Sequence, residues 1–242
     1  MTNPTTYLFV DGGHLRKYYE EFANKWFGND GELDFDKIKA DFNADKCFYF
    51  DCVDDESKFR GLRKSNWRVE LGYLSSGNKR TQKEVDTLIA VSMVRYSHIG
   101  KMDKAILLTG DGDFRPVVEE LIRMDIDVKI VGDKKHTSQR LMGEAIAVQL
   151  IDIDDYYKWT KESVRTQKPL EIKKYDGTTY PNLYSPNSIK EGNFMNHKVD
   201  LVENEGLYYL VYKGDEFLGF SANNQLDLEI YFELKYGEAD WN

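Results

Sequence analysis

Cysteine and long apolar runs are scarce in this sequence, and each scarcity excludes a class of protein. Two cysteines among 242 residues cannot form a disulfide framework or, by themselves, a four-ligand zinc site. Because Cys47 and Cys52 fall in one strand-like stretch, we interpret them as buried thiols. No segment approaches the roughly 18 to 20 unbroken apolar residues of a membrane helix. We therefore expect neither a disulfide scaffold nor an association with membranes.

Signals for secretion are also lacking at the start of the chain. Residues 1–6 carry neither the basic region nor the apolar region of a secretory signal, so we expect a cytoplasmic protein. Hydrophobic residues make up 41% and charged residues 31% of the chain, as is typical of an ordinary globular protein. This length allows one large domain, or one ordinary domain with a small appendage.

The charge is unevenly distributed along the chain. A net charge of −9 argues against a protein that coats nucleic acid nonspecifically, because phosphate binding depends on clustered Lys and Arg. Acidic residues crowd residues 203–240, whereas the basic residues between Lys58 and Lys83 face a single acid, Glu70. This basic stretch is either a track for a polyanion, with Trp67 and Tyr73 stacking on bases, or a solvated amphipathic face with two core aromatics.

Apolar runs and helical patterns alternate through the first two-thirds of the sequence. The predicted strands are 6–10, 46–53, 68–74, 104–109, 127–131 and 148–153. The predicted helices are 14–27, 57–67, 83–97, 116–124 and 138–147. This alternation is typical of an α/β fold, in which helices cover both faces of a mostly parallel sheet.

Aspartates stand at the ends of these predicted strands. Asp11 ends the first strand, Asp111 and Asp113 follow the strand at 104–109, and Asp86 lies near the start of a helix. Since ligands of such folds bind beyond the carboxyl ends of the strands, we expect these four carboxylates to converge. The alternative is that they cap helices or turns, a role that suits Asp113 in particular and that we also expect of Asp103.

Converging carboxylates repel one another unless a cation neutralises them or their pKa values rise. Oxygen ligands without His or Cys favour magnesium or manganese over zinc. Either ion activates a bound water and stabilises charge on a leaving oxygen, so the pattern indicates cleavage of a phosphodiester.

Four segments carry a resemblance to a known family: YLFVDGGHL, KEVDTLIAVSM, AILLTGDGDFRPVVEEL and VKIVG. They resemble the NYN family of PIN-like nucleases, of the LabA-like group, over residues 5–157. The resemblance implies a three-layer PIN-like fold and a Mg²⁺- or Mn²⁺-dependent endoribonuclease, a hydrolase of RNA, with DNA a less favoured substrate. The residues implied as catalytic residues and metal ligands are Asp11, Asp86, Asp111 and Asp113.

Two positions depart from the pattern of this family. His14 stands where many relatives have an asparagine, and Ser92 stands where many have another aspartate about two turns after Asp86. Either Asp54 or Asp55 compensates, or the site holds one metal. The alternative function is a catalytically impaired PIN-like module that binds RNA or a protein.

Residues around the acidic cluster are expected to support it or to contact the substrate. Thr109 either orients the loop of Asp111 or has a purely structural role. His136, in the loop after the strand at 127–131, is interpreted as incidental rather than as a proton-transfer group. The basic residues expected to contact RNA phosphates are Arg80, Lys83, Arg115, Lys134, Lys135 and Arg140.

The last third of the sequence has a different pattern. We expect a nuclease domain at 1–158, an irregular linker at 159–194 with prolines at 169, 181 and 186, and a small β-rich module at 195–242. Two apolar segments around Lys-Gly-Asp-Glu at 213–216 predict a hairpin, while 226–236 fits a strand or a helix. This module either mediates homo-oligomerisation, binds a protein partner, masks the basic stretch, or is a packing extension.

Overall fold

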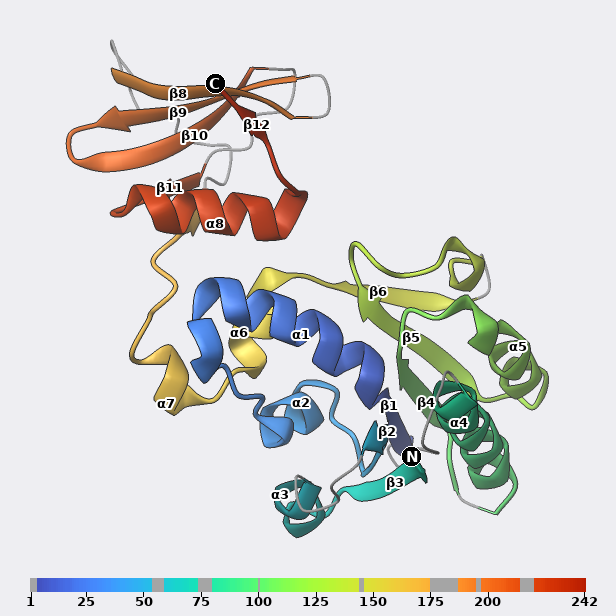
Figure 1. The fold of residues 1–242 in the computed structure, drawn as a ribbon. Helices are drawn as coiled ribbons and strands as arrows, with labels where there is room; N and C mark the ends of the chain where they lie inside the picture. Colours follow the sequence, from blue (N-terminus) through green and yellow to red (C-terminus); the bar gives the residue numbers. More distant parts are fainter. Residues whose placement is uncertain are drawn as a thin grey trace. The chain divides into compact units, whose positions relative to one another are not determined.

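The structure, a computed structural model, describes residues 4–53, 59–73, 80–99, 101–143, 146–174, 187–194, 197–213 and 220–242. It divides into two compact units. The first unit comprises Met1–Glu21 and Glu32–Lys161, and the second comprises Phe22–Gly31 and Glu162–Asn242. Each unit contains one six-stranded sheet (Figure 1).

The sheet of the first unit is entirely parallel, with the strand order β3-β2-β1-β4-β5-β6. Its strands are β1 (Thr6–Asp11), β2 (Lys46–Val53), β3 (Arg68–Tyr73), β4 (Lys104–Leu108), β5 (Asp127–Asp133) and β6 (Ala147–Ile151). Together with the separate antiparallel sheet near the C-terminus, this parallel sheet confirms the predicted α/β fold class with a β-rich extension.

Helices flank this sheet on both faces. The α-helices that belong to or enter the first unit are α1 (Gly12–Trp26), α2 (Phe35–Asp41), α3 (Arg60–Lys64), α4 (Arg80–Ile99), α5 (Arg115–Arg123) and α6 (Ile153–Trp159). Short 3-10 helices are η1 (Gly28–Asp30), η3 (Gly112–Phe114) and η4 (Gln139–Leu141). Figure 1 shows α4 and α5 on one face of the sheet and α2 and α6 on the other, so the unit has three layers.

The core explains why the central strands are continuously apolar. All six residues of β1 are buried, because both faces of this strand are covered by helices. Toward α4 and α5, Phe9 stacks on Phe48 of β2 with ring centroids 4.9 Å apart, and both pack with Ile89 and Met93 of α4. This packing holds the carboxyl ends of β1 and β4 beside the N-terminal half of α4.

Three local predictions differ from the structure. The helix predicted at 138–147 is wrong: in residues 138–143, the described start of this segment, only η4 forms, because Ser138 N–H donates to the carbonyl of Gly110 and Ser138 Oγ caps Arg140 N–H. The helix predicted at 57–67 is shortened to α3. Helix α2 was not predicted, although Asp34 caps it by accepting a hydrogen bond from Lys37 N–H at 3.1 Å.

The sheet of the second unit is antiparallel, with the order β12-β8-β9-β10-β11-β7. Its elements are α7 (Glu162–Arg165), β7 (Lys173–Lys174), β8 (Asn187–Phe194), β9 (His197–Asn204), β10 (Leu207–Lys213), β11 (Phe220–Ala222), α8 (Gln225–Tyr236) and β12 (Asp240–Trp241). The structure places β8 inside the range predicted as irregular linker. Antiparallel pairing of β10 with β11 agrees with the predicted hairpin, whose connecting residues 214–219 lie outside the described residues.

Helix α8 decides between the two structures expected for residues 226–236. Asn224 caps it by accepting a hydrogen bond from Leu226 N–H at 2.8 Å, and Leu228, Tyr231 and Phe232 share its buried face. Among the described residues, no helix has the length and apolar character needed to cross a membrane.

Candidate active site

Asp11 is the most deeply held of the predicted acidic residues. It ends β1 with 8% of its surface exposed. Its Oδ2 accepts a hydrogen bond from Thr109 Oγ1 at 3.0 Å, and its Oδ1 accepts one from His14 N–H at 3.1 Å. Burial raises the pKa of Asp11, and the nearby carboxylates of Asp51 and Asp111 raise it further, against the lowering effect of the two hydrogen bonds.

Asp111 and Asp113 lie in the loop that follows β4. Asp111 N–H donates to Thr109 Oγ1 at 3.3 Å, so one buried threonine contacts both Asp11 and the loop of Asp111. Asp111 Oδ1 accepts from Asp113 N–H at 2.9 Å and thereby caps η3. The capping role expected of Asp113 therefore belongs to Asp111. Asp113 is exposed, and its Oδ1 pairs with Arg140 Nη1 at 3.0 Å.

Asp86 shows that the four carboxylates influence one another. It lies on the second turn of α4 and is partly buried. Burial raises the pKa of Asp86 to about 6, and the negative charges of Asp11, Asp111 and Asp113 contribute to the shift. The alternative of simple capping accounts for one oxygen each of Asp11 and Asp111, but not for this mutual repulsion.

The donor set suits a hard divalent cation that keeps part of its water shell. Among the described residues, no three His, Cys, Asp or Glu side chains lie close enough to form a complete metal cage. Magnesium is usually held through one or two carboxylates, with water as the other ligands, so a complete cage is not required. A cation beside these carboxylates would also relieve the repulsion that raises the pKa of Asp86. The residues present therefore fit a magnesium or manganese ion.

Comparisons with known proteins identify the family of this chain. The model of the family described as "NYN domain" matches residues 5–154. The chain belongs to the NYN-domain family. A relative, the low amplitude and bright protein LabA of Synechococcus elongatus, is 22% identical over 174 residues, which cover 66% of this chain and 89% of LabA. A crystal structure of a protein of unknown function from Vibrio parahaemolyticus has a TM-score of 0.50 at 18% identity and covers 66% of this chain and 99% of that one; it shows the fold alone.

Ser92 occupies the NYN-domain position at which a further acid was expected. It is buried on α4, and its hydroxyl donates to Glu70 Oε2 of β3 at 3.3 Å. Glu70 is held in turn by Arg68 Nε at 2.9 Å. The aspartates expected to compensate, Asp54 and Asp55, lie outside the described residues.

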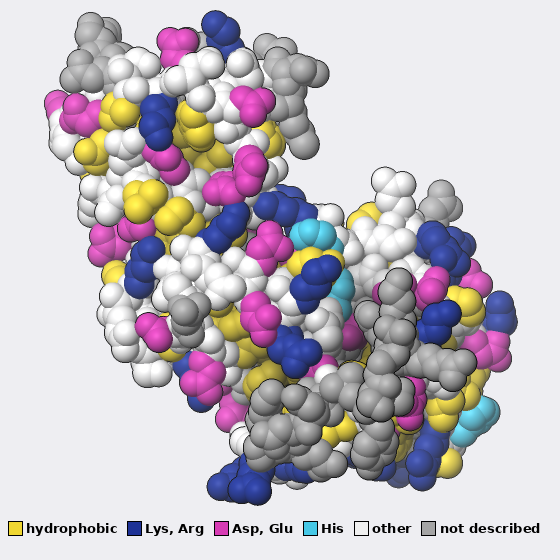
Figure 2. Space-filling view, viewed as in Figure 1, with side chains coloured by type: hydrophobic (Ala, Val, Ile, Leu, Met, Phe, Trp, Pro, Cys, Tyr) yellow, Lys and Arg dark blue, Asp and Glu magenta, His cyan; other side chains and the backbone are white. Residues whose placement is uncertain are grey.

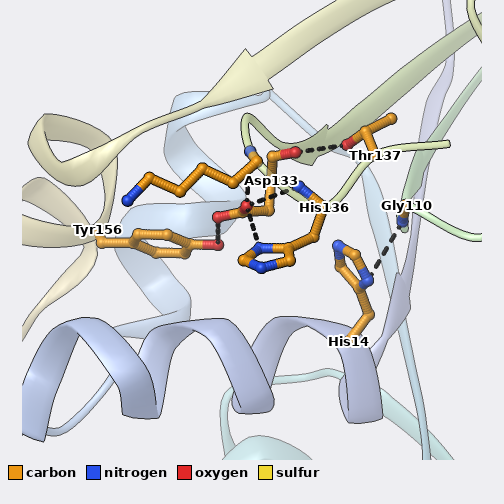
Figure 3. Close-up of polar contacts among 7 residues, drawn as sticks. His14, Gly110, Asp133, His136, Thr137 and Tyr156 are labelled. Atoms are coloured by element: carbon orange, nitrogen blue, oxygen red, sulfur yellow. Dashed lines mark hydrogen bonds and ion pairs between the residues drawn. The ribbon is translucent and has the colours of Figure 1, made fainter. Parts of the chain in front are cut away.

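His14 supports the acidic loop of the NYN domain. Its Nδ1 accepts a hydrogen bond from Gly110 N–H at 3.3 Å (Figure 3). Burial lowers the pKa of His14 to about 4, so the ring is neutral at pH 7 and its proton is on Nε2. A Cβ on Gly110 would lie 2.4 Å from His14 Cε1, so only glycine allows this close approach.

Two buried aspartates were missed by reading the sequence. Asp51 lies within β2 and accepts hydrogen bonds from Arg16 Nη2 at 3.2 Å, Tyr49 Oη at 3.0 Å and Cys52 N–H at 2.7 Å. Asp133 ends β5, two residues beyond the predicted end of that strand. The signal that was available for Asp51 is a charged residue inside the apolar run KCFYFDCV, because charged residues are seldom buried without a partner.

The basic residues predicted to contact RNA fall into two groups. Arg140 pairs with Asp113, and Arg115 donates to the carbonyl of Arg140 at 3.3 Å and to Glu119 at 2.7 Å, so both stand beside the acidic loop. Lys134 and Lys135 are exposed on the loop after β5, and Lys83 is exposed in the first turn of α4.

The structure describes only some of the other residues singled out in the sequence. Arg80 begins α4, but its side chain and that of Tyr73 lie outside the described residues. Trp67 is buried, with its ring centroid 5.5 Å from that of Phe35, which agrees with the core role rather than with base stacking. Asp103 accepts a hydrogen bond from Thr5 N–H at 2.7 Å, which is consistent with the turn or capping role expected of it.

Proposed function

We propose that this chain is a metal-dependent endoribonuclease, in which one or two of the carboxylates of Asp11, Asp86, Asp111 and Asp113 bind a magnesium or manganese ion directly and the others face its bound water. Members of the NYN family are typically nucleases, and this chain contains an NYN domain. The observation that carries the proposal is the contact of Thr109 Oγ1 with both Asp11 Oδ2, at 3.0 Å, and the N–H of Asp111, at 3.3 Å, which brings the acidic ends of two strands together. The raised pKa of Asp86, caused first by burial and then by the charges of the other three carboxylates, supports it. Repulsion between these carboxylates destabilises the folded protein unless a bound cation neutralises them.

The residues of the site have distinct roles in this proposal. A divalent ion supplies the Lewis acid that activates water and stabilises charge on the leaving oxygen. Thr109 and His14 hold the Asp11 carboxylate in one orientation, which reduces the entropy that the site loses when it binds a cation. Arg140 and Arg115 place positive charge next to Asp113, where they can contact RNA phosphates.

A cleavage assay with a matched aspartate control tests this proposal. Labelled single-stranded RNA and the matching DNA are incubated with manganese, magnesium or a chelator. We expect cleavage of RNA by the wild type with metal, and its loss in Asp111→Asn. The control is Asp127→Asn, because Asp127 begins β5 at the opposite edge of the sheet and pairs only with Lys104 among the ion pairs of the described residues. Cleavage that survives in Asp111→Asn, or that does not depend on metal, contradicts the proposal.

One observation favours a second function, a binding module without turnover. Ser92 takes the place of an expected acid, and its hydroxyl is engaged by Glu70 rather than facing the other carboxylates. If the wild type cleaves no more RNA than Asp111→Asn with either metal but still binds RNA, the binding module is the correct function.

A further inference from the structure

Both the ring and the backbone of His136, an exposed loop residue, have defined contacts. Its Nδ1 lies 2.7 Å from Asp133 Oδ1, and its backbone N–H donates to the same oxygen at 3.1 Å (Figure 3). The ring is stacked on Tyr18 of α1, with centroids 3.9 Å apart and planes 11° from parallel. Two different elements, β5 and α1, therefore fix the position of one imidazole.

The partner of Nδ1 determines which ring atom is left for a ligand. Asp133 carboxylate is surrounded by donors: Oδ1 also accepts from Lys135 N–H at 2.9 Å, and Oδ2 accepts from Tyr156 Oη at 2.9 Å. Since a carboxylate only accepts, Nδ1 carries a hydrogen and Nε2 is the atom on the outer edge of the ring. The side chain of Asp133 is 10% exposed and that of His136 is 36% exposed, so the pair is anchored at its buried end and open at the other.

This pair lies directly beside the acidic loop. A Cβ on Gly110 would lie 2.6 Å from the carbonyl oxygen of His136, and Ser138 N–H donates to the carbonyl of Gly110 at 2.9 Å. Gly110 immediately precedes Asp111 in the sequence. The loop that carries His136 is thus packed against the loop that carries two of the four carboxylates.

Lysines lie on both of the segments that hold the ring. Lys134 and Lys135 are exposed on the same loop as His136, and Lys17 Nζ lies 5.0 Å from the centroid of the Tyr18 ring. Figure 2 shows histidine, basic and hydrophobic side chains adjoining one another on one face of the molecule. An anion is the ligand that this combination suits.

We propose that His136 binds a backbone phosphate of the RNA, next to the phosphate that is cleaved, through a hydrogen bond from Nε2. This contact rests on the proposed function and adds His136 to the residues expected to bind the RNA. In this contact both ring nitrogens donate: Nδ1–H to Asp133 Oδ1, as in the structure, and Nε2–H to the phosphate. The ring itself contacts Asp133 and Tyr18. Behind these, Tyr156 of α6 donates to Asp133 Oδ2, and the ring of His14 packs against Tyr18.

Binding without cleavage tests the proposal. The affinity for a labelled single-stranded RNA is measured with a chelator present. We expect His136→Ala to weaken binding about tenfold, as for the loss of one hydrogen bond between charged groups. Asp133→Asn should weaken it as well, and the double variant should lose little more than His136→Ala alone, because Asp133 acts only through the ring.

Controls separate this contact from a general loss of folding. His98→Ala removes an exposed histidine at the last turn of α4 and should bind like the wild type. Melting temperatures identify any variant that fails to fold. If His136→Ala does not fold, His136→Asn is measured in its place.

A spectroscopic measurement observes the ring directly. In a ¹⁵N-labelled wild type, RNA should shift the Nε2 signal of His136 toward its protonated position while Nδ1 stays protonated. An Nε2 signal that does not move at saturating RNA, or equal affinity of His136→Ala and the wild type, overturns the proposal.

Cleavage by the same variants distinguishes the two proposals. If His136→Ala binds and cleaves like the wild type while Asp111→Asn does not cleave, only the phosphate contact is overturned. If the wild type binds RNA more tightly than His136→Ala but never cleaves it, the contact is supported and the ribonuclease is overturned.

Discussion

Thr109 Oγ1 donates a hydrogen bond to Asp11 Oδ2 at 3.0 Å and accepts one from Asp111 N–H at 3.3 Å. A completely buried hydroxyl at the end of β4 therefore joins a carboxylate of β1 to the acidic loop. Because β1 and β4 are neighbouring parallel strands, their carboxyl ends meet at one edge, and the threonine links the two.

Thr109→Val should loosen this junction without changing the shape of the side chain much. Removing the hydroxyl leaves Asp11 Oδ2 and Asp111 N–H without their partner, so we expect a loss of about 1 to 3 kcal/mol in the free energy of unfolding. The pKa of Asp11 should rise further, because a hydrogen bond that lowers it is lost. Urea unfolding of Thr109→Val and of the control Thr109→Ser measures the effect; equal losses in both variants would contradict it.

Asp86→Asn should stabilise the metal-free protein at neutral pH. The pKa of Asp86 is raised from 3.8 to about 6, so the folded state binds a proton more tightly than the unfolded chain does. Ionisation of Asp86 thus opposes folding, and wild-type stability falls as the pH rises through this window. We expect Asp86→Asn to be about 1 to 2 kcal/mol more stable at pH 7, allowing for solvent screening.

This difference should disappear on acidification below about pH 4, where Asp86 is protonated in both states. Urea unfolding in chelator across this range measures it, with Asp127→Asn as the control. A difference that is independent of pH would show that the ionisation of Asp86 is not its cause.

Gly110→Ala should disturb the site through sterics alone. The added Cβ would lie 2.4 Å from His14 Cε1 and 2.6 Å from the carbonyl oxygen of His136, and the second neighbour is backbone. We expect a destabilisation of about 1 to 3 kcal/mol. Gly61→Ala is the matched control, because a Cβ at Gly61 has no neighbour within 4 Å. Gly61 lies in α3, where alanine stabilises a helix relative to glycine. Thermal melts should move in opposite directions; a Gly110→Ala melt at or above that of the wild type would refute the clash.

Manganese should raise the melting temperature of the wild type, since a ligand of the folded state alone stabilises it by mass action. At about 100 times the dissociation constant, the gain is about 2.7 kcal/mol. Asp111→Asn should gain much less, and excess chelator should reverse the gain. Equal shifts in the wild type, Asp111→Asn and Asp127→Asn would indicate nonspecific binding elsewhere on this acidic chain.

The sequence by itself determined the class of fold and the strands that bring the acidic residues together. Strand periodicity and the βα alternation are local patterns, and a right-handed parallel arrangement follows from them. Asp11 could be placed because it directly follows an apolar run, and Asp111 and Asp113 because they lie in the short polar segment after another. The roles expected of these residues in catalysis, RNA as the substrate, cytoplasmic residence and a partner for the C-terminal module remain predictions.

Only the tertiary structure decided which polar groups are buried together and which local patterns are overridden. Residues 138–147 have helical periodicity, yet Ser138 N–H donates to the carbonyl of Gly110, and the described residues 138–143 contain the short 3-10 helix η4 instead of an α-helix. His136 was interpreted as incidental because two residues that order it are remote in the sequence: Tyr18, which stacks on its ring, and Tyr156, which donates to its partner Asp133. Hydrogen bonds and stacking between remote segments depend on how the chain folds back on itself, and local residue patterns carry no record of that.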